Sequence, residues 1–409
     1  MHILYNILAS VAVFILRLLA LLGHSRIRSF LAMRSSSANS ANVNVRKRAW
    51  FHCASLGEYE QTVPVIESYK NLHPETNILL TFFSPSGYFP LLPNQPKWFS
   101  QGDLISALPL DTPRRVRAFL NSTAREVKFF ASCKYEVWPE LMKQLSESNI
   151  PSFVFATHFT PKSAPLKSSL PGRFLLRAWS RFDMIFTQDE SSFSLLKLKG
   201  LNSVVAGDPR ADRVLSISKH SRAPEDLKAW KGDANLVLAG SSWFQEEGAL
   251  ASVVWTENRK LMIAPHEIHS ENIDRILSLF PQATRYSSKL FETNIIVIDS
   301  IGLLSSLYSL ADIAVVGGGY GKGIHNVLEP AAFGVPMITG PKINRFREAV
   351  LLKQHSALQT AATPLALTQK MEDLLSPDNI QQLKRSGDAA LSFVTDQTGS
   401  AEKISSYLP

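Results

Sequence analysis

Short apolar runs alternate with amphipathic stretches along the chain from residue 49 onward. The apolar runs lie at 49–53, 77–83, 127–131, 152–156, 183–187 and 202–206, and then at 235–239, 260–264, 295–298, 312–316 and 335–338. Helical patterns separate them, for example at 57–72, 112–122, 138–148 and 189–199. Such alternation predicts βαβ units, which form parallel sheets covered by helices on both faces. Because the series runs twice, we predict an α/β chain with two Rossmann-like domains.

The length of 409 residues also favours about two domains. Gly207, Pro209 and Pro224 interrupt the pattern between the two series. The predicted parts are 1–34 (an apolar helix with a basic flank), 35–48 (a linker), 49–206 (the N-terminal domain), 207–378 (the C-terminal domain) and 379–409 (a C-terminal helix that can pack back on the N-terminal domain). Ligands of open α/β sheets bind beyond the carboxyl ends of the strands. We therefore expect the active site in a central cleft between the domains, built from loops that follow strands.

The N-terminal segment 3–22 is apolar and long enough to span a bilayer as a helix. Its polar neighbours recur at helical spacing in one narrow stripe, formed by His2, Asn6, Ser10, Arg17 and His24. A cleaved signal peptide is disfavoured because the positive charges follow the apolar run, and a buried core helix would be unusually apolar. We predict a membrane-associated helix, and both a spanning and an interfacial arrangement fit the pattern.

Positive charge is concentrated in the same half of the chain. Residues 1–205 hold 23 Lys and Arg against 13 Asp and Glu, whereas the net charge of the whole chain is +8. The basic residues that follow the apolar run are Arg26, Arg28, Arg34, Arg46, Lys47 and Arg48. By the positive-inside tendency they place the body on the cytoplasmic side of a membrane, with an anionic membrane surface as a partner. Nucleic acid is not an expected partner, since neither zinc spacing nor a recognition motif is present.

Cys53 and Cys133 are the two cysteines of the chain. They can build neither a disulfide framework nor a CxxC metal site, and a reducing compartment fits best. Both lie in apolar, strand-like surroundings, so we expect buried and inert thiols.

A glycine-rich loop directly follows the apolar run at 312–316. It reads Gly317-Gly318-Gly319-Tyr320-Gly321-Lys322-Gly323-Ile324-His325-Asn326, and we predict a helix from near His325 through Glu329 to Gly334. Glycines let a backbone approach a ligand closely, and a helix start offers unpaired N–H groups to an anion. The alternative is a merely flexible turn, and the run matches neither the dinucleotide fingerprint nor the P-loop. Glu329 could accept both hydrogen bonds of a ribose diol, or be a surface glutamate without a role.

Two more strand ends of the second half are candidates for phosphate binding. Gly240-Ser241-Ser242 follows the run at 235–239 and precedes a helical stretch, so its serines could cradle a phosphate or only cap the helix. Ala264-Pro265-His266-Glu267 closes the next run, and His266 is as readily structural as functional.

The first domain offers a carboxylate after its first strand, in Ser55-Leu56-Gly57-Glu58. We expect Glu58 to project from a helix start, where it could act as general base for an acceptor hydroxyl if its surroundings raise its pKa. A carboxylate at a helix N-terminus also has a purely structural explanation. Lys134-Tyr135-Glu136-Val137-Trp138-Pro139, which follows the run at 127–131, adds further charge beside aromatic rings.

In combination, these segments resemble the Kdo (3-deoxy-D-manno-octulosonic acid) transferases of lipopolysaccharide biosynthesis, which are GT-B glycosyltransferases of family GT30. The matching pieces, in family order over roughly residues 48–350, are Trp50–Glu58, Tyr135–Pro139, Gly207–Asp212, Gly240–Trp243, Glu246-Glu247, Ala264–His266, Asp299–Leu303, Gly317–Glu329 and Gly340-Pro341. Each piece is short, but the ordered set is specific. The apolar N-terminal helix agrees with the family as well.

The resemblance implies CMP-Kdo as donor, a tetraacylated lipid A precursor (lipid IVA) as acceptor, inversion at the anomeric carbon, and no metal or cofactor. Glu58 falls on the catalytic base, and Glu136 with its neighbour Lys134 falls on the acceptor side. The positions on or beside the CMP site are Ser241, Ser242, Pro265, His266, Gly318, Gly319, Lys322, Gly323, Asn326 and Glu329. The donor is itself a carboxylate, and Lys162 or Arg210 could pair with it.

This chain departs from the family at three of these positions. Many members have arginine at the position of His266, so the contact with cytidylate could pass to Arg210 or Lys322. Many have a pair of glycines where this chain has Ile324, and an acidic or neutral residue where it has Lys134. The rival interpretations are a GT-B glycosyltransferase for a UDP-sugar, a sugar-nucleotide epimerase, which would not need a membrane helix, and a non-catalytic membrane-bound nucleotide-sugar binder.

Overall fold

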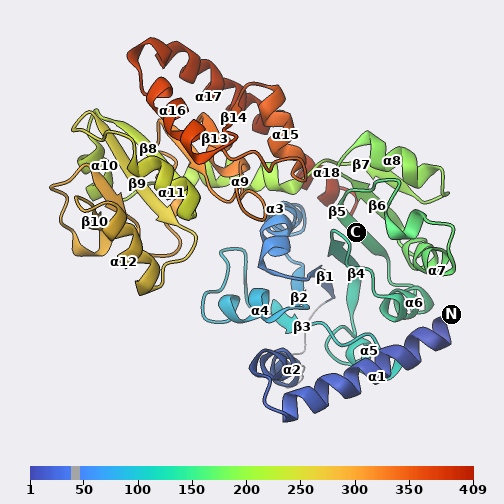
Figure 1. Ribbon diagram of the computed structural model, residues 1–409. Coiled ribbons are helices and arrows are strands. Elements are labelled where there is room, and N and C mark those ends of the chain that lie inside the picture. Colours follow the sequence, from blue (N-terminus) through green and yellow to red (C-terminus); the bar gives the residue numbers. More distant parts are fainter. Residues whose placement is uncertain (38–46) are drawn as a thin grey trace. The chain divides into compact units, whose positions relative to one another are not determined.

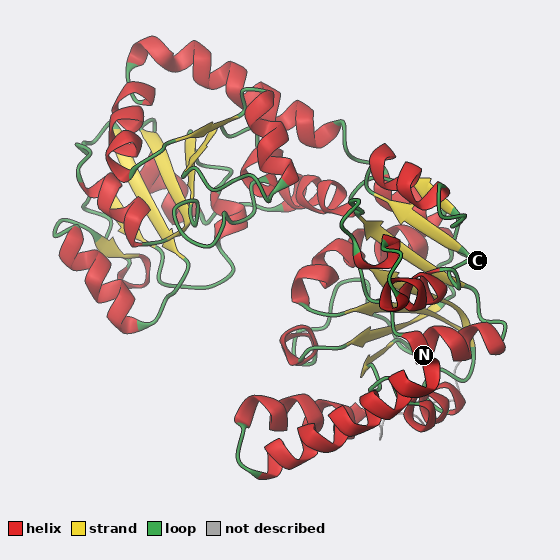
Figure 2. Ribbon diagram, turned by 45° about the vertical axis from the view of Figure 1, so that its right-hand side comes forward, coloured by secondary structure: helices red, strands yellow, loops and turns green. Residues whose placement is uncertain are grey.

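The computed structural model describes residues 1–37 and 47–409, which form two compact units. The first unit comprises Met1–Arg213 with Thr398–Pro409, and the second comprises Val214–Gln397. Each unit has a seven-stranded parallel sheet with helices on both faces (Figure 1, Figure 2). The expected α/β class with two Rossmann-like domains is confirmed.

The sheet of the first unit has the order β3-β2-β1-β4-β5-β6-β7. Its strands are β1 (Arg48–Cys53), β2 (Asn77–Phe82), β3 (Leu104–Ala107), β4 (Val127–Cys133), β5 (Ser152–Thr157), β6 (Met184–Thr187) and β7 (Ser203–Val205). Strand β3 was not expected from the sequence, because only four residues form it and Ser106 interrupts their apolar pattern.

Two helical layers bury this sheet. One layer is α5 (Pro113–Asn121), α6 (Pro139–Glu147), α7 (Leu170–Trp179) and α8 (Glu190–Lys197), and its core includes Trp50 and Phe130. The other layer is α2 (Ser25–Ser37), α3 (Leu56–Leu72), α4 (Pro85–Leu91) and α18 (Ser400–Ser405), and its core includes Phe51 and Phe129. Alternate residues of β1 and β4 therefore supply both cores, as expected for a strand buried on both faces.

The sheet of the second unit has the order β10-β11-β9-β8-β12-β13-β14. Its strands are β8 (Asn235–Ser242), β9 (Arg259–Pro265), β10 (Thr284–Arg285), β11 (Ile295–Val297), β12 (Ile313–Val316), β13 (Met337–Thr339) and β14 (Leu358–Thr360). Its helices include α10 (Glu225–Lys231), α11 (Phe244–Ala251), α12 (Ser270–Leu279), α13 (Leu304–Leu307), α14 (Leu328–Ala332), α15 (Arg347–Gln354), α16 (Pro364–Leu374) and α17 (Ile380–Thr395). The edge strands β10 and β14 were not expected, because they are too short to give a periodic signal.

The two units are bounded differently from the predicted domains. Helix α9 (Pro209–His220) runs through the boundary, so the first unit continues past residue 206 to Arg213. Of the stretch 379–409, α17 packs on α14 within the second unit, whereas α18 packs on α3 in the first. Helix α2 extends to Ser37, into the segment expected to be a linker, and residues 38–46 of that segment lie outside the described residues.

Helix α1 (His2–Leu21) is attached to the first unit near its beginning. The ring of His2 and the amide of Asn6 contact Glu140 Oε2, at 2.6 and 2.9 Å, and the Tyr5 hydroxyl donates to Asp111 Oδ2 at 2.6 Å. These residues include two members of the predicted polar stripe. By length and composition the helix could cross a membrane.

The rest of the circumference of α1 is apolar and exposed. The exposed large hydrophobic residues are Met1, Ile3, Leu4, Ile7, Leu8, Val11, Phe14, Ile15, Leu18, Leu21 and Leu22. After α1 the chain turns into α2, where Arg34 Nη2 donates to the Phe83 carbonyl at 2.9 Å. The start of α1 thus contacts the first unit directly, and its end is joined to the unit through α2, so the helix lies along this unit (Figure 1).

Asp111 joins α1 to the start of α6, which generates a test of this docking. Its carboxylate is buried and also accepts hydrogen bonds from the backbone N–H groups of Glu140 and Leu141, at 3.0 and 2.8 Å. We expect Asp111→Ala to lower the free energy of unfolding by about 2–4 kcal/mol, because it leaves two helix N–H groups without acceptors. Tyr5→Phe removes only the bond from α1 and should cost about 1 kcal/mol. Urea unfolding of the full chain in detergent measures both, and equal losses would contradict this role of Asp111.

Candidate functional site

Glu58 lies in the first turn of α3, directly after β1. The backbone N–H and the hydroxyl of Ser55 both donate to its Oε2, at 2.8 and 3.0 Å, and complete a capping box. Within the described part of the chain no hydrogen bond reaches Oε1, and the side chain is partly exposed. The structural explanation considered for this carboxylate therefore holds for one oxygen, and the other is open to a ligand.

Two buried thiols lie behind Glu58, at the ends of β1 and β4. Burial raises the pKa of Cys53, and the negative charges of Glu58 and Glu136 add to this rise. Burial also raises the pKa of Cys133, where the charge of Lys134 opposes the rise and that of Glu58 adds to it. Both thiols are therefore protonated and inert at neutral pH. These charge effects also place Glu58, Lys134 and Glu136 around the same end of the sheet.

A buried histidine of β1 faces this cluster, and its surroundings could not be predicted from the sequence. His52 is fully buried, with Nδ1 3.0 Å from Thr81 Oγ1. Its Nε2 has no hydrogen-bond partner in the described residues and lies 3.7 Å from Glu136 Oε2. Lys134 adopts a left-handed backbone conformation with φ of 62° at the end of β4, which directs the next residues out of the strand.

The two cations proposed for the donor carboxylate differ in their surroundings. Arg210 Nε and Nη2 donate to Asp208 Oδ2 at 2.9 and 2.6 Å, so its charge is already paired with a buried carboxylate. Asp208 also accepts hydrogen bonds from the amides of Gln61 and Gln188, at 2.9 and 2.8 Å. Lys162 is exposed in the loop after β5. Of the two, Lys162 is the more available.

A further polar pair at this edge was missed from the sequence. His158 follows β5, and its Nδ1 lies 2.8 Å from Asp189 Oδ2. Asp189 also caps α8 through the backbone N–H of Ser192 at 2.7 Å, and its hydrogen bonds lower its pKa to about 2 against the effect of burial. The residues lie 31 positions apart, and only the pairing of β5 with β6 brings them together.

In the second unit a buried carboxylate joins two of the predicted loops. Glu246 is fully buried and accepts hydrogen bonds from the backbone N–H groups of Trp243 and Gly318, at 3.2 and 3.0 Å. Burial raises its pKa, while these two donors favour the charged form. Glu246 belongs to one of the family-like motifs, but its role as the connection between the β8 and β12 loops follows only from the structure.

Three aromatic rings pack against one another next to this connection. The ring centroids of Trp243 and His266 are 4.7 Å apart, and those of His266 and His325 are 4.5 Å apart. The indole N–H of Trp243 donates to His325 Nε2 at 3.1 Å, so this nitrogen is an acceptor. Burial, and next the charge of His266, lower the pKa of His325, which favours its neutral form. His266 is exposed and can contact a ligand as well as stack.

The glycines of the β12 loop pack against other backbone segments. A Cβ on Gly317 would lie 2.0 Å from the Ser241 carbonyl oxygen, one on Gly318 would lie 2.4 Å from the Gly323 oxygen, and one on Gly319 would lie 2.4 Å from the Gly340 nitrogen. The expected purpose of these glycines, close approach to a ligand, is therefore corrected in part: they let three strand ends approach one another. Gly323 likewise has no room for a Cβ, since the Phe346 ring would be 2.5 Å away.

The expected helix start near His325 was wrong. Helix α14 begins at Leu328 and has five residues, and Asn326 precedes it. Ile324 is buried, so the side chain that replaces a family glycine fills the interior of the domain. The glycine run followed by His-Asn resembled a helix start, but His325 donates its backbone N–H to Gly317 and closes the loop instead.

Asn326 and Glu329 do come together. The Asn326 amide donates to Glu329 Oε1 at 2.9 Å, and the Ser305 hydroxyl donates to Oε2 at 2.7 Å. Each oxygen of Glu329 keeps a second lone pair for a diol. This carboxylate is therefore held in place rather than being a surface glutamate without contacts.

The two serines that were expected to cradle a phosphate, Ser241 and Ser242, have different surroundings. The expected turn at Gly240–Ser242 is part of β8, with a bulge at Ser241, whose φ is 50°. Ser242 is buried, and its hydroxyl donates to Glu247 at 2.8 Å, so it stabilises the domain from inside. Pro265 is also buried, whereas Ser241 is half-buried and Lys322 is exposed. No group of three or more His, Cys, Asp and Glu side chains suited to a metal ion occurs in residues 1–37 and 47–409.

The chain is similar in sequence to known transferases. A family model described as 3-deoxy-D-manno-octulosonic-acid transferase (kdotransferase) matches residues 26–213. The chain is 26% identical over 399 residues to the 3-deoxy-D-manno-octulosonic acid transferase of Haemophilus influenzae, which covers 93% of this chain and 90% of that protein. It is 27% identical over 343 residues to the enzyme of the same name from Aquifex aeolicus. This alignment covers 81% of this chain and 87% of that protein.

Two solved structures share the fold. The UDP-GlcNAc 2-epimerase from Neisseria meningitidis bound to UDP-GlcNAc has a TM-score of 0.58 at 11% identity, covering 87% of this chain and 98% of that one. MurG from Acinetobacter baumannii has a TM-score of 0.54 at 14% identity, and the match covers 88% of this chain and 99% of that one. The chain is thus a glycosyltransferase with GT-B architecture. Within that class it is similar to the Kdo transferases, in line with the resemblance of the sequence motifs.

The packing of the glycine loop is testable by a matched pair of substitutions. We expect Gly317→Ala to destabilise the second unit by roughly 1–3 kcal/mol or more, because the new methyl group overlaps the Ser241 carbonyl. Gly321→Ala places its Cβ at an ordinary 3.6 Å from the Gly318 oxygen and should change stability by about 0.5 kcal/mol at most. Thermal unfolding of the two full-length variants, followed by circular dichroism, gives the midpoints. Equal midpoints would contradict the packing role.

Proposed function

We propose that this chain transfers Kdo from CMP-Kdo to a tetraacylated lipid A precursor, with inversion at the anomeric carbon and without a metal ion or other cofactor. The observation that carries the proposal is the position of Glu58 in the Kdo transferase domain. Its carboxylate is fixed through Oε2 and open at Oε1, at the carboxyl end of a parallel sheet.

The donor site of this proposal is the set of accessible groups at the strand ends of the second unit. Glu329, held by Ser305 and Asn326, accepts the hydroxyls of the ribose. Ser241, His266 and Lys322 are accessible to the phosphate and the base. The buried Ser242, Pro265, Gly318, Gly319 and Gly323 support this site by packing and leave direct contact to their neighbours.

In the reaction, Glu58 Oε1 takes the proton from an acceptor hydroxyl while the hydroxyl oxygen attacks the anomeric carbon. The bond from this carbon to the CMP phosphate breaks on the opposite face, and CMP leaves with the electron pair. Lys162 or Arg210 pairs with the donor carboxylate, and Lys134 and Glu136 lie on the acceptor side. After transfer, the proton on Glu58 passes to solvent and restores the base.

Glu58→Gln tests the base. Glutamine can keep the capping box, because its amide oxygen also accepts from Ser55, but it cannot take a proton. We expect kcat to fall roughly 100-fold or more while the affinity for CMP and the unfolding midpoint stay the same. Glu60→Gln is the control on the same helix, where the loss of a partly exposed ion pair with Arg213 should change kcat less than about 2-fold. A near-normal kcat for Glu58→Gln would remove this residue from the role.

The donor and acceptor are tested by incubating the full chain in detergent with CMP-Kdo and the lipid A precursor and measuring the product mass. A mass increase by one or more Kdo residues supports the proposal and counts the sugars. Transfer of a sugar from a UDP-sugar, and not from CMP-Kdo, would contradict the proposal and favour a UDP-sugar glycosyltransferase. CMP-Kdo binding without any product would favour the non-catalytic binder.

We also propose that α1 lies in the interface of the cytoplasmic leaflet of the cell inner membrane, since its start is bound to the first unit and its end is joined to that unit through α2. We expect Ile3→Glu with Phe14→Glu, on the exposed apolar face, to release the chain from anionic vesicles, because burying charged groups in lipid is costly. Leu198→Glu with Ile301→Glu makes the same change in charge at two exposed residues outside α1 and should leave binding intact. Vesicle flotation measures both pairs, and equal binding would exclude α1 as the anchor.

A further inference from the structure

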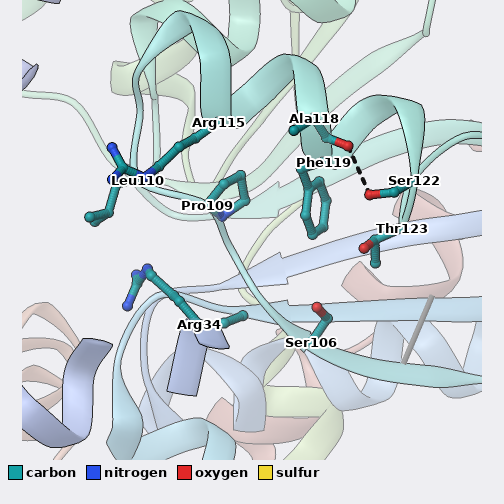
Figure 3. A pocket seen from close by; sticks show the side chains of 10 residues that line it. Arg34, Ser106, Pro109, Leu110, Arg115, Ala118, Phe119, Ser122 and Thr123 are labelled. Atoms are coloured by element: carbon teal, nitrogen blue, oxygen red, sulfur yellow. Dashed lines mark hydrogen bonds between the residues drawn. The ribbon is translucent and has the colours of Figure 1, made fainter. Parts of the chain in front are cut away.

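A cavity of about 270 Å³ opens in the first unit between α2, α5 and the end of β3 (Figure 3). Its lining includes Arg34, Ser106, Arg115, Phe119, Ser122 and Thr123. Sugar nucleotides and other large ligands need pockets of roughly 300–1,000 Å³. The cavity is therefore suited to a small group, and two guanidinium groups at its wall select for an anion.

Arg115 brings a positive charge without a carboxylate to balance it. Its Nη1 lies 3.5 Å from Thr112 Oγ1, and no ion pair with an Asp or Glu of the described residues is found. Burial, and next the positive charge of Arg17 on α1, lower the pKa of Arg115. Like charges gathered in a half-buried place repel one another, and a bound anion would remove that repulsion.

Arg34 is oriented for the same cavity. Its Nη1 donates to the Phe30 carbonyl and its Nη2 to the Phe83 carbonyl, both at 2.9 Å. The guanidinium carbon lies 3.8 Å from the centroid of the Phe30 ring and 4.9 Å from that of the Phe83 ring. Burial lowers its pKa to about 10, which still leaves it charged at neutral pH. The side chain is thus held in place before any ligand arrives.

A second and independent observation is an unpaired hydroxyl in the same wall. Ser106 is 1% exposed, and its Oγ has no hydrogen-bond partner in the described residues. Figure 3 shows Ser106 and Arg34 on one side of the cavity, with Phe119 and Arg115 on the other. Buried hydroxyls without a partner are rare in native proteins, because each costs free energy. An anion in this cavity would accept its hydrogen bond.

The place of the cavity relates it to Glu58. Ser106 pairs in register with Thr81, and Thr81 pairs with His52, so the cavity lies two strands away from β1. At about 4.8 Å per strand this is roughly 10 Å across the sheet, and Glu58 follows β1 at the same end. Arg17 lies on α1 itself, so the cavity also adjoins the helix with the exposed apolar face.

We propose that this cavity binds a phosphate monoester carried by the sugar of the lipid acceptor. The acyl chains then lie along α1, the phosphate contacts Arg34, Arg115 and Ser106, and a hydroxyl of the same sugar reaches Glu58. This inference rests on the proposed function, because it names the part of the acceptor that the first unit recognises.

Arg115→Gln tests the contact in the full chain, with the phosphorylated lipid A precursor and a chemically dephosphorylated precursor as acceptors. We expect KM for the phosphorylated acceptor to rise about 10-fold or more, from the loss of a charge-assisted contact. The kcat, the KM for CMP-Kdo and the KM for the dephosphorylated acceptor should stay within about 2-fold. Ser106→Ala should raise KM for the phosphorylated acceptor to a smaller extent. Arg117→Gln removes an exposed arginine of α5 that is not in the lining, and should leave all these values unchanged.

The other outcomes are decisive as well. Equal effects on both acceptors would mean a structural role of Arg115, and no effect on either would refute the site. Weaker binding of Arg115→Gln to anionic vesicles, with an unchanged acceptor KM in detergent, would assign the cavity to a phospholipid headgroup instead. If millimolar inorganic phosphate competed at the cavity but KM did not differ between the two acceptors, the cavity would be a site for free phosphate only. If the chain transferred no Kdo at all, direct binding of the two precursors to wild type and Arg115→Gln would still test the cavity separately from the proposed function.

Discussion

Backbone hydrogen bonds between parallel strands decide which polar groups of this chain can act together. In the first unit they align Ser106, Thr81, His52 and Ser132 across four neighbouring strands, all buried on the same face. The next residues of these strands lead into the loops, so the loop after each strand begins at one edge of the sheet. If one strand shifted by one residue, its polar residue in this row would point into the core on the other face of the sheet. The position of Glu58, three residues after Ser55, depends on that alignment of β1.

The same constraint explains how the second unit uses its glycines. The ends of β8, β12 and β13 approach so closely that Gly317, Gly319 and Gly340 have no space for a side chain. Glu246 then joins two of these loops through backbone N–H groups, and the rings of Trp243, His266 and His325 cover the connection. Rigid loops of this kind hold their accessible groups in place before a ligand binds, which reduces the entropy lost on binding.

Much of this architecture could be predicted from the amino-acid sequence, for physical reasons that differ between elements. Buried strands such as β1, β8 and β12 carry continuous apolar runs, and these gave the fold class. The short edge strands β10 and β14 have no such pattern, and the start of α14 was misplaced because a glycine run before His325 can either begin a helix or close a loop. Periodicity shows which face of an element is buried but not which atoms meet there. For that reason the contacts of Glu246, His52 and the His158–Asp189 pair were found only in the structure.

The first unit is discontinuous along the chain, and this affects how it can fold. Ala401, Ile404 and Leu408 belong to its buried core, and the Tyr69 hydroxyl donates to the carbonyl of Pro409 at 2.7 Å. During synthesis this core stays incomplete until the ribosome has passed through the whole second unit, while α1 has long since emerged. The apolar face of α1 and the unfilled groove beside α3 are therefore exposed together for most of translation. Early contact with the membrane, or with a chaperone, would protect such a nascent chain from aggregation.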